Sequence, residues 1–199
     1  MALTRLGPNN STNISGINLT SQVTGTLPVA NGGTAITSGF VNGVTQGFSS
    51  VYMPGDLAIS GDSYISASGT GAALSIRNTG ASGTGIVTDV TSGNIQLDKT
   101  GFYFVIYNFT GNITSGDDIV LPYIQTYNGS SSSNHAYGYV DVSTGAPADN
   151  FTCVIHAIVD VTDTSTVKLR MGYSSANNIT LYGTGQSVTS MSFLRLGDT

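Results

Sequence analysis

Two adjacent carboxylates, Asp117 and Asp118, are the residues whose types first suggest catalysis. A pair of carboxyl groups hydrolyses a glycosidic bond when the two flank it across a cleft at a defined separation. Neighbouring residues of an extended chain point to opposite sides, so this pair does not meet that requirement. The Ser-Gly-Asp-Asp run is instead typical of a turn. We therefore predict no catalytic residue here and expect a protein that is not an enzyme.

Metal-ligating residues are few and are not arranged as ligands. Asp160 and Asp163 lie close together in the sequence but lack the spacing of a calcium loop, and turn formation explains them. His135 and His156 show no zinc-ligand pattern. A single cysteine excludes an internal disulfide, and neither a nucleophile elbow nor a phosphate-binding loop occurs. We expect no metal site and no cofactor.

The charge pattern argues against two classes of partner. The net charge is -5, and the six lysine and arginine residues are scattered rather than clustered. Nucleic-acid binding requires a dense basic footprint, so we expect no nucleic-acid partner. No apolar run is long enough to cross a bilayer, and the start of the sequence has no secretory signal, so we expect no membrane insertion and synthesis in a cytoplasm.

The composition favours β-structure. All eleven acidic residues are aspartate, and glycine, serine, threonine and asparagine are abundant, whereas glutamate is absent and lysine is rare. Short apolar runs separated by turn residues predict strands. The expected strands are 56–60, 64–67, 73–77, 85–90, 95–97, 101–110, 119–127, 135–142, 151–161, 166–173, 179–182 and 189–196. About eight of these, in the second half of the chain, predict a two-sheet jelly-roll sandwich.

The chain divides into three parts. Residues 1–55 contain no charged side chain after Arg5, although apolar residues recur among glycine, serine and threonine. Such a segment is too apolar for ordinary disorder and too short to enclose a core, so we expect identical copies or a larger assembly to cover it. Residues 56–93 form either a neck or part of the head, and residues 94–199 form the head.

The expected strand 101–107 is apolar on both faces. Alternation places Phe102, Phe104 and Ile106 on one face and Tyr103, Val105 and Tyr107 on the other. A sandwich strand in a monomer normally has one polar face. We therefore expect one face to pack in the core and the other to pack against a neighbouring subunit, unless the strand lies inside a three-layer arrangement.

The loop 127–137 is the expected contact with the outside, because adaptable polar groups flanked by tyrosines are typical of recognition surfaces. The alternative is a hairpin tip without a partner. The proposed receptor-contact residues are Tyr127, Asn128, Ser131, Asn134, His135 and Tyr137.

Two resemblances extend these predictions. Residues 19–34, Leu-Thr-Ser-Gln-Val-Thr-Gly-Thr-Leu-Pro-Val-Ala-Asn-Gly-Gly-Thr, resemble a segment that recurs in bacteriophage tail-fibre and related virion proteins. The resemblance implies that residues 1–55 anchor the protein to the virion and intertwine the subunits. The implied virion-anchoring residues are Leu19, Val23, Leu27, Pro28, Val29, Gly32 and Gly33.

The second resemblance covers residues from about 95 to 199. The run Leu97–Phe104 is similar to the Gly-x-Tyr-x-Phe strand of C1q/TNF-like jelly rolls, and Ser190–Leu196 resembles their closing strand. Members of that family are compact homotrimers. By this similarity Phe102, Phe104 and Ile106 are assigned to the trimer interface.

The combined prediction is an all-β, homotrimeric virion protein that consists of an extended N-terminal segment and a jelly-roll head. We expect a tail fibre or appendage, assembled in the host cytoplasm, whose partners are other virion proteins and a glycan or protein of the host surface. The alternatives are a capsid decoration or head-fibre protein and, less favoured, a polysaccharide-degrading spike.

Overall fold

The computed structural model describes residues 47–66, 74–77, 86–113, 116, 118–142, 149–183 and 188–198. Within these residues the regular structure consists of β-strands and a single 3-10 turn, η4 (Thr91–Gly93), so the all-β prediction is confirmed. The predicted virion-anchoring residues lie outside the described residues; they are Leu19, Val23, Leu27, Pro28, Val29, Gly32 and Gly33.

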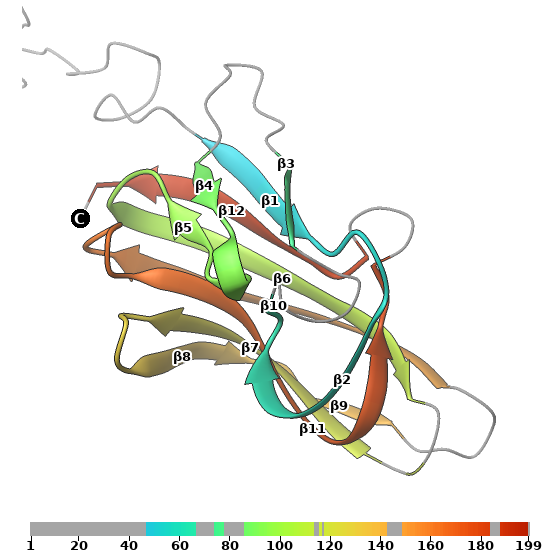
Figure 1. Ribbon diagram of the computed structural model, residues 1–199. Helices are drawn as coiled ribbons and strands as arrows, with labels where there is room; N and C mark the ends of the chain where they lie inside the picture. The colour runs from blue at the N-terminus through green and yellow to red at the C-terminus, as the bar shows by residue number, and fades with distance from the viewer. Residues whose placement is uncertain are drawn as a thin grey trace, which may run out of the picture. The chain divides into compact units, whose positions relative to one another are not determined.

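Ten of the strands form one continuous antiparallel ladder that folds into two layers, here called the first and second sheets, packed as a jelly-roll sandwich (Figure 1). The first sheet contains, in spatial order, β3 (Ser75–Arg77), β1 (Phe48–Tyr52), β12 (Ser190–Gly197), β6 (Gly101–Ile113) and β10 (Asp149–Val161). The second contains β2 (Leu57–Tyr64), β11 (Lys168–Leu181) and β7 (Asp118–Tyr127), with β8 (Ser132–Tyr137) and β9 (Val140–Val142) along the other edge of β7.

Two further features complete the sandwich. Strands β4 (Val87–Asp89) and β5 (Gln96–Leu97) form a small separate ladder on either side of η4. At the C-terminal end of β6, residues Gly111–Ile113 pair with Ile179–Leu181 of β11, and this ladder joins the two sheets. The long strands β6 and β11 therefore fix how the sheets face each other.

Strand β6 separates the core from the outer surface by strict alternation. Tyr103, Val105, Tyr107 and Phe109 are fully buried in the core, whereas the residues between them are half-buried or exposed on the outer face. The core is completed from the second sheet by apolar side chains of β7 and β11, among them Ile124, Leu169 and Met171. The period-2 pattern of the sequence is thus realised over the whole strand.

The sandwich begins earlier in the chain than the sequence indicated. Strand β1 lies within residues 1–55, which were predicted to be an extended segment, but it pairs with β12 along its full length. In the part 56–93, β3 pairs with β1 and β2 pairs with β11. The strands of residues 48–77 therefore belong to the same sandwich as the predicted head.

Pro122 lies in an interior strand, not at an edge. On one side β7 pairs continuously with β11, including Pro122 opposite Tyr173. On the other side of β7, the pairing with β9 ends at Val120 and the pairing with β8 begins at Tyr123. The missing N–H of the proline falls in this gap, where no ladder bond is required.

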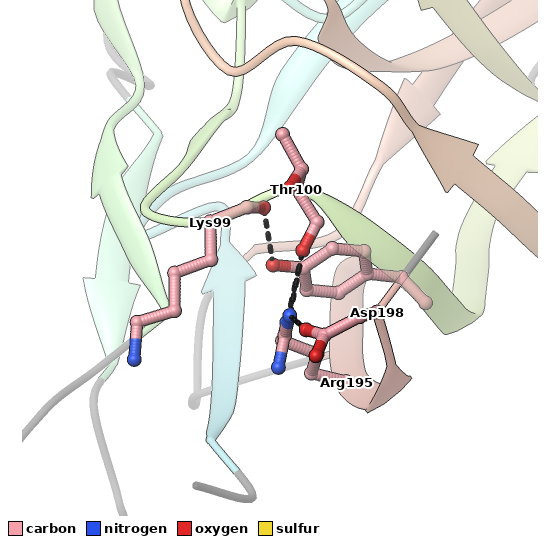
Figure 2. Close-up of polar contacts among 5 residues, drawn as sticks. Lys99, Thr100, Arg195 and Asp198 are labelled. Atoms are coloured by element: carbon pink, nitrogen blue, oxygen red, sulfur yellow. Dashed lines mark hydrogen bonds and ion pairs between the residues drawn. The ribbon is translucent and has the colours of Figure 1, made fainter. Parts of the chain in front are cut away.

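Arg195 ties the last strand to the start of β6 (Figure 2). Its Nε and Nη2 donate to the carbonyl oxygen of Thr100 at 3.1 and 2.8 Å, and Nη2 also pairs with Asp198. Nearby, the Tyr103 hydroxyl donates to the carbonyl oxygen of Lys99 at 2.7 Å. The two bonds from Arg195 to Thr100 hold β12 beside the start of β6, at the end where a bulge interrupts the ladder.

Candidate functional site

An apolar row crosses the outer face of the first sheet. Four residues from four neighbouring strands are direct cross-strand partners in it: Phe48 of β1, Leu194 of β12, Phe104 of β6 and Ile158 of β10. Opposed residues of antiparallel strands point to the same face of the sheet. The exposed fraction is 41% for Phe48 and 62% for Ile158, and the two central side chains are half-buried. We call these four residues the apolar row.

The surface beside the apolar row contains further apolar side chains. Phe102 and Leu196 are exposed, Ile106 is half-buried, and a shallow groove of about 160 Å³ with only apolar lining surface runs along Phe104 and Ile106. Single exposed apolar side chains are ordinary, whereas neighbouring exposed apolar side chains are typical of contact surfaces.

The three residues predicted for the trimer interface lie in this region. Phe102, Phe104 and Ile106 all point away from the core, on the face that carries the apolar row. The sequence did not identify Phe48, Leu194 and Ile158 as parts of the same surface, because they come from strands far apart in the chain. Strand β10 adds a second feature. It pairs with β6, and its other edge forms no ladder in the described part of the chain.

The segment predicted as a receptor-contact loop is a β-hairpin. Its strands are β7 and β8, so only Asn128–Ser131 form the turn, whereas Asn134, His135 and Tyr137 lie on β8. The Asn128 side-chain oxygen accepts hydrogen bonds from the backbone nitrogens of Ser130 and Ser131 at 3.1 and 2.8 Å. The tip is therefore fixed by an Asx turn.

The side chains of the hairpin are also linked across its strands. Asn134 accepts a hydrogen bond from Gln125 at 2.9 Å and donates to the Tyr137 hydroxyl. His135 Nε2 and Thr126 Oγ1 are 2.7 Å apart, and partial burial lowers the pKa of His135. Because the hairpin is held in one conformation, its exposed groups offer a pre-ordered surface.

A cavity of about 390 Å³, lined mainly by residues with polar side chains, lies next to the hairpin turn. Three segments that are distant in the sequence line it: 89–96 from β4, η4 and β5; 127–129 from the end of β7 and the turn; and 165–168 before and at the start of β11. Tyr127 and Asn128 are the two predicted contact residues that face it. Ser131, Asn134, His135 and Tyr137 are exposed but do not line it.

Arg170 supports one wall of this cavity. Its side chain is almost fully buried, and its guanidinium carbon lies 4.1 Å from the ring centroid of Tyr64 and 3.5 Å from that of Tyr127. Its Nε donates to Asn94 Oδ1 at 2.7 Å. A guanidinium that stacks on two rings and also binds an amide fixes the positions of all three partners.

The described residues contain no group of three or more histidine, cysteine, aspartate or glutamate side chains placed to hold a metal. Among them there is also no helix long and apolar enough to cross a membrane. The Asp163 carboxylate accepts hydrogen bonds from Ser165 and Thr166, and these bonds lower its pKa to about 2. In the structure this residue therefore orders the turn before β11.

Comparison with known proteins identifies the fold. No protein-family model matches the sequence, and no curated protein matches it. Among solved structures, the Eiger TNF of S. frugiperda superposes with a TM-score of 0.61 at 14% identity, over 77% of this chain and 94% of that chain. Murine APRIL superposes with a TM-score of 0.53 at 8% identity, over 76% of this chain and 100% of that chain. The order and packing of its strands therefore give this protein the fold of a TNF-like jelly roll.

Proposed function

We propose that this protein is a non-enzymatic bacteriophage virion protein that forms a homotrimer and attaches the particle to the host surface. The observation that carries the proposal is the apolar row Phe48–Leu194–Phe104–Ile158. It crosses four strands on a face that the described residues leave partly exposed. Covering it with another copy of the chain removes this apolar surface from water.

The composition of this face suits a contact between protein subunits. None of the four residues of the row is charged, and aromatic residues contribute two of them. Depletion of charge and enrichment of aromatic side chains are typical of the centre of an interface. Among the described residues, the edge of β10 away from β6 also forms no ladder. A long strand edge of this kind is normally covered, so it suits a contact with a neighbouring subunit. The TNF-like fold is compatible with this assembly.

The virion assignment rests on the sequence. Residues 19–34 resemble a segment of phage tail-fibre and related proteins, and the uncharged residues before β1 still call for a covering partner. In this proposal the N-terminal segment attaches to the particle and the jelly-roll head faces the host.

The oligomeric state of the full chain tests the first half of the proposal. Light scattering coupled to size-exclusion chromatography is expected to give the mass of three chains. A well-folded species with the mass of one chain would contradict the trimer.

Adsorption and copy number test the second half. The purified protein is expected to compete with phage adsorption to the host, and the virion is expected to carry few copies. A copy number that scales with the capsomers, together with unchanged adsorption, would instead identify a capsid decoration protein. Release of fragments from host polysaccharide by the purified protein would indicate a degrading spike.

A further inference from the structure

The cavity beside the β7–β8 turn has the dimensions of a small-ligand site. Its volume is about 390 Å³, within the range of roughly 300 to 1,000 Å³ typical of such sites. It shares no residue with the apolar row, so assembly through the row uses different side chains. The cavity therefore needs an explanation of its own.

The walls of the cavity are fixed before any ligand arrives. Tyr127 is stacked on Arg170, and its hydroxyl donates to the carbonyl oxygen of Gly129 at 2.5 Å. Asn94 is held by Arg170, and the turn that contains Asn128 is held by its own side chain. A site whose side chains are already ordered loses little conformational entropy on binding.

The amide groups of the wall have defined orientations. An arginine only donates, so Asn94 Oδ1 is the atom bound to Arg170 Nε, and Asn94 Nδ2 is left as a donor at the cavity wall. Likewise Asn128 Oδ1 accepts from Ser130 and Ser131, which leaves its Nδ2 as a donor. The Gln96 side chain adds one amide acceptor and one amide donor.

The described lining of the cavity carries one charge of each sign, from the Asp89 carboxylate and the Lys168 ammonium group. The hydrogen bond from Thr91 to Asp89 Oδ1, at 2.8 Å, lowers the pKa of Asp89 and keeps it an ionised acceptor. Lys168 Nζ donates to the carbonyl oxygen of Thr164 at 2.8 Å. The Asp163 carboxylate adjoins the lining, where it accepts hydrogen bonds from Ser165 and Thr166, so the site does not favour an anion. Among the described lining residues there is no aliphatic side chain.

A ligand that fits this lining is uncharged and carries many hydroxyl groups. Each hydroxyl both donates and accepts, which matches a wall of amides, hydroxyls and one carboxylate. A rigid tyrosine among such groups provides apolar contact area at low entropic cost. We propose that this cavity binds a neutral saccharide, which in the context of the proposed function is a glycan unit of the host surface.

The test uses the purified full chain and a panel of oligosaccharides. The panel contains neutral chains of hexoses, N-acetylhexosamines and deoxyhexoses, together with chains that carry uronic or sialic acids. At least one neutral oligosaccharide is expected to bind, and its affinity is then measured by titration calorimetry. The Gln96→Ala variant is expected to weaken that binding about tenfold, the effect of one lost hydrogen bond to a ligand. Asp89→Asn is expected to weaken it as well.

Gln125→Ala is the matched control, because Gln125 lies on the hairpin and bonds to Asn134 but does not line the cavity. The Gln125→Ala variant is expected to bind the neutral oligosaccharide with the same affinity as the unmodified chain. Binding of no saccharide, binding of acidic chains alone, or binding that Gln125→Ala abolishes and Gln96→Ala retains would each overturn the inference.

The solution mass of each variant separates this test from the test of the proposed function. A trimer that binds no saccharide refutes the cavity assignment and leaves the trimeric assembly intact. A monomer that binds a neutral saccharide through Gln96 refutes the assembly and retains the site.

Discussion

The guanidinium carbon of Arg170 lies 3.5 Å from the ring centroid of Tyr127, and this contact links β11, the strand between β2 and β7, to the rim of the cavity. Arg170 is almost fully buried, and no carboxylate in the described residues forms an ion pair with it. Its charge is instead stabilised by cation–π contacts with the two tyrosine rings and by the hydrogen bond to Asn94. The arginine therefore acts as a structural support for the cavity wall.

Arg170→Lys is expected to lower the free energy of unfolding by about 1 to 2 kcal/mol. Lysine still buries a positive charge, but it cannot form the planar stack on the rings or the Nε hydrogen bond to Asn94. Urea unfolding measures this. Arg77→Lys is the control, since Arg77 lies 4.9 Å from the Tyr52 ring on a half-buried edge strand, and its cost is expected to be smaller. Equal costs for the two variants would contradict the role assigned to Arg170.

Ile158→Asp is expected to convert the trimer into folded monomers. The side chain is 62% exposed in the single chain, so the change costs the isolated fold little, but a buried, unpaired carboxylate in a subunit interface is strongly unfavourable. Light scattering gives the mass and circular dichroism confirms the fold. Ala58→Asp, an exposed position of β2 in the other sheet, is expected to remain trimeric. A trimeric Ile158→Asp variant would exclude the apolar row from the interface.

Gly172→Ala is expected to destabilise the sandwich by about 1 to 3 kcal/mol, the usual cost of overpacking. A β-carbon at this position of β11 would lie 1.9 Å from the Tyr123 ring. That ring is buried over Gly172, and its hydroxyl donates to Asp62 and to the carbonyl oxygen of Ser63 at 2.6 and 2.9 Å, so it cannot move aside freely. Thermal unfolding measures the loss. Gly197→Ala meets no atom within 4 Å and is expected to be close to neutral, so a similar loss in both variants would refute this explanation.

Alkaline pH is expected to unfold the protein through its buried tyrosines. Burial, together with the nearby Asp98, raises the pKa of Tyr103 from 10.0 to about 12, and burial also raises the pKa values of Tyr107, Tyr123 and Tyr173. The folded state then holds protons that the unfolded state releases, so stability is constant below about pH 10 and falls as the pH rises toward 12.

Urea unfolding at a series of pH values between 8 and 12, chosen to span that window of roughly two units, measures the effect. Tyr103→Phe is expected to lower stability at pH 8 by about 1 kcal/mol, because the bond to the Lys99 carbonyl is lost. It is also expected to show a shallower decline at alkaline pH. An unchanged decline would mean that Tyr103 does not titrate in this window.

Several strand boundaries followed from local pattern, but others depended on distant contacts. The expected strand 101–110 corresponds to β6, because every second residue there is a large apolar side chain. Strand β1 was missed, since two of its buried positions are serines. Ser49 is buried because its hydroxyl accepts hydrogen bonds from the backbone nitrogens of Ile86 and Val87, at 2.8 and 3.3 Å, on a remote segment.

The expected strand 135–142 is divided in the structure. It breaks between β8 and β9 at Gly138, whose N–H donates to the carbonyl oxygen of Pro122 at 2.7 Å. A β-carbon at Gly138 would lie 2.4 Å from the Cys153 sulfur, so close packing of β10 requires glycine there. Conversely, the expected strands 166–173 and 179–182 are one strand, β11, with a bulge between Ser175 and Ile179. In both cases the deciding contact is with another part of the sandwich.

The sequence by itself determined that the described part is built of strands and that Tyr103 and Phe104 point to opposite faces, because alternation is a local property of an extended chain. Only the tertiary structure decided that Phe48, Leu194, Phe104 and Ile158 form one row, since register between distant strands is set by the whole sandwich. The cavity is a second such case. Its lining comes from three separate segments whose residues are common in turns. Only the packing of the two sheets brings these segments together.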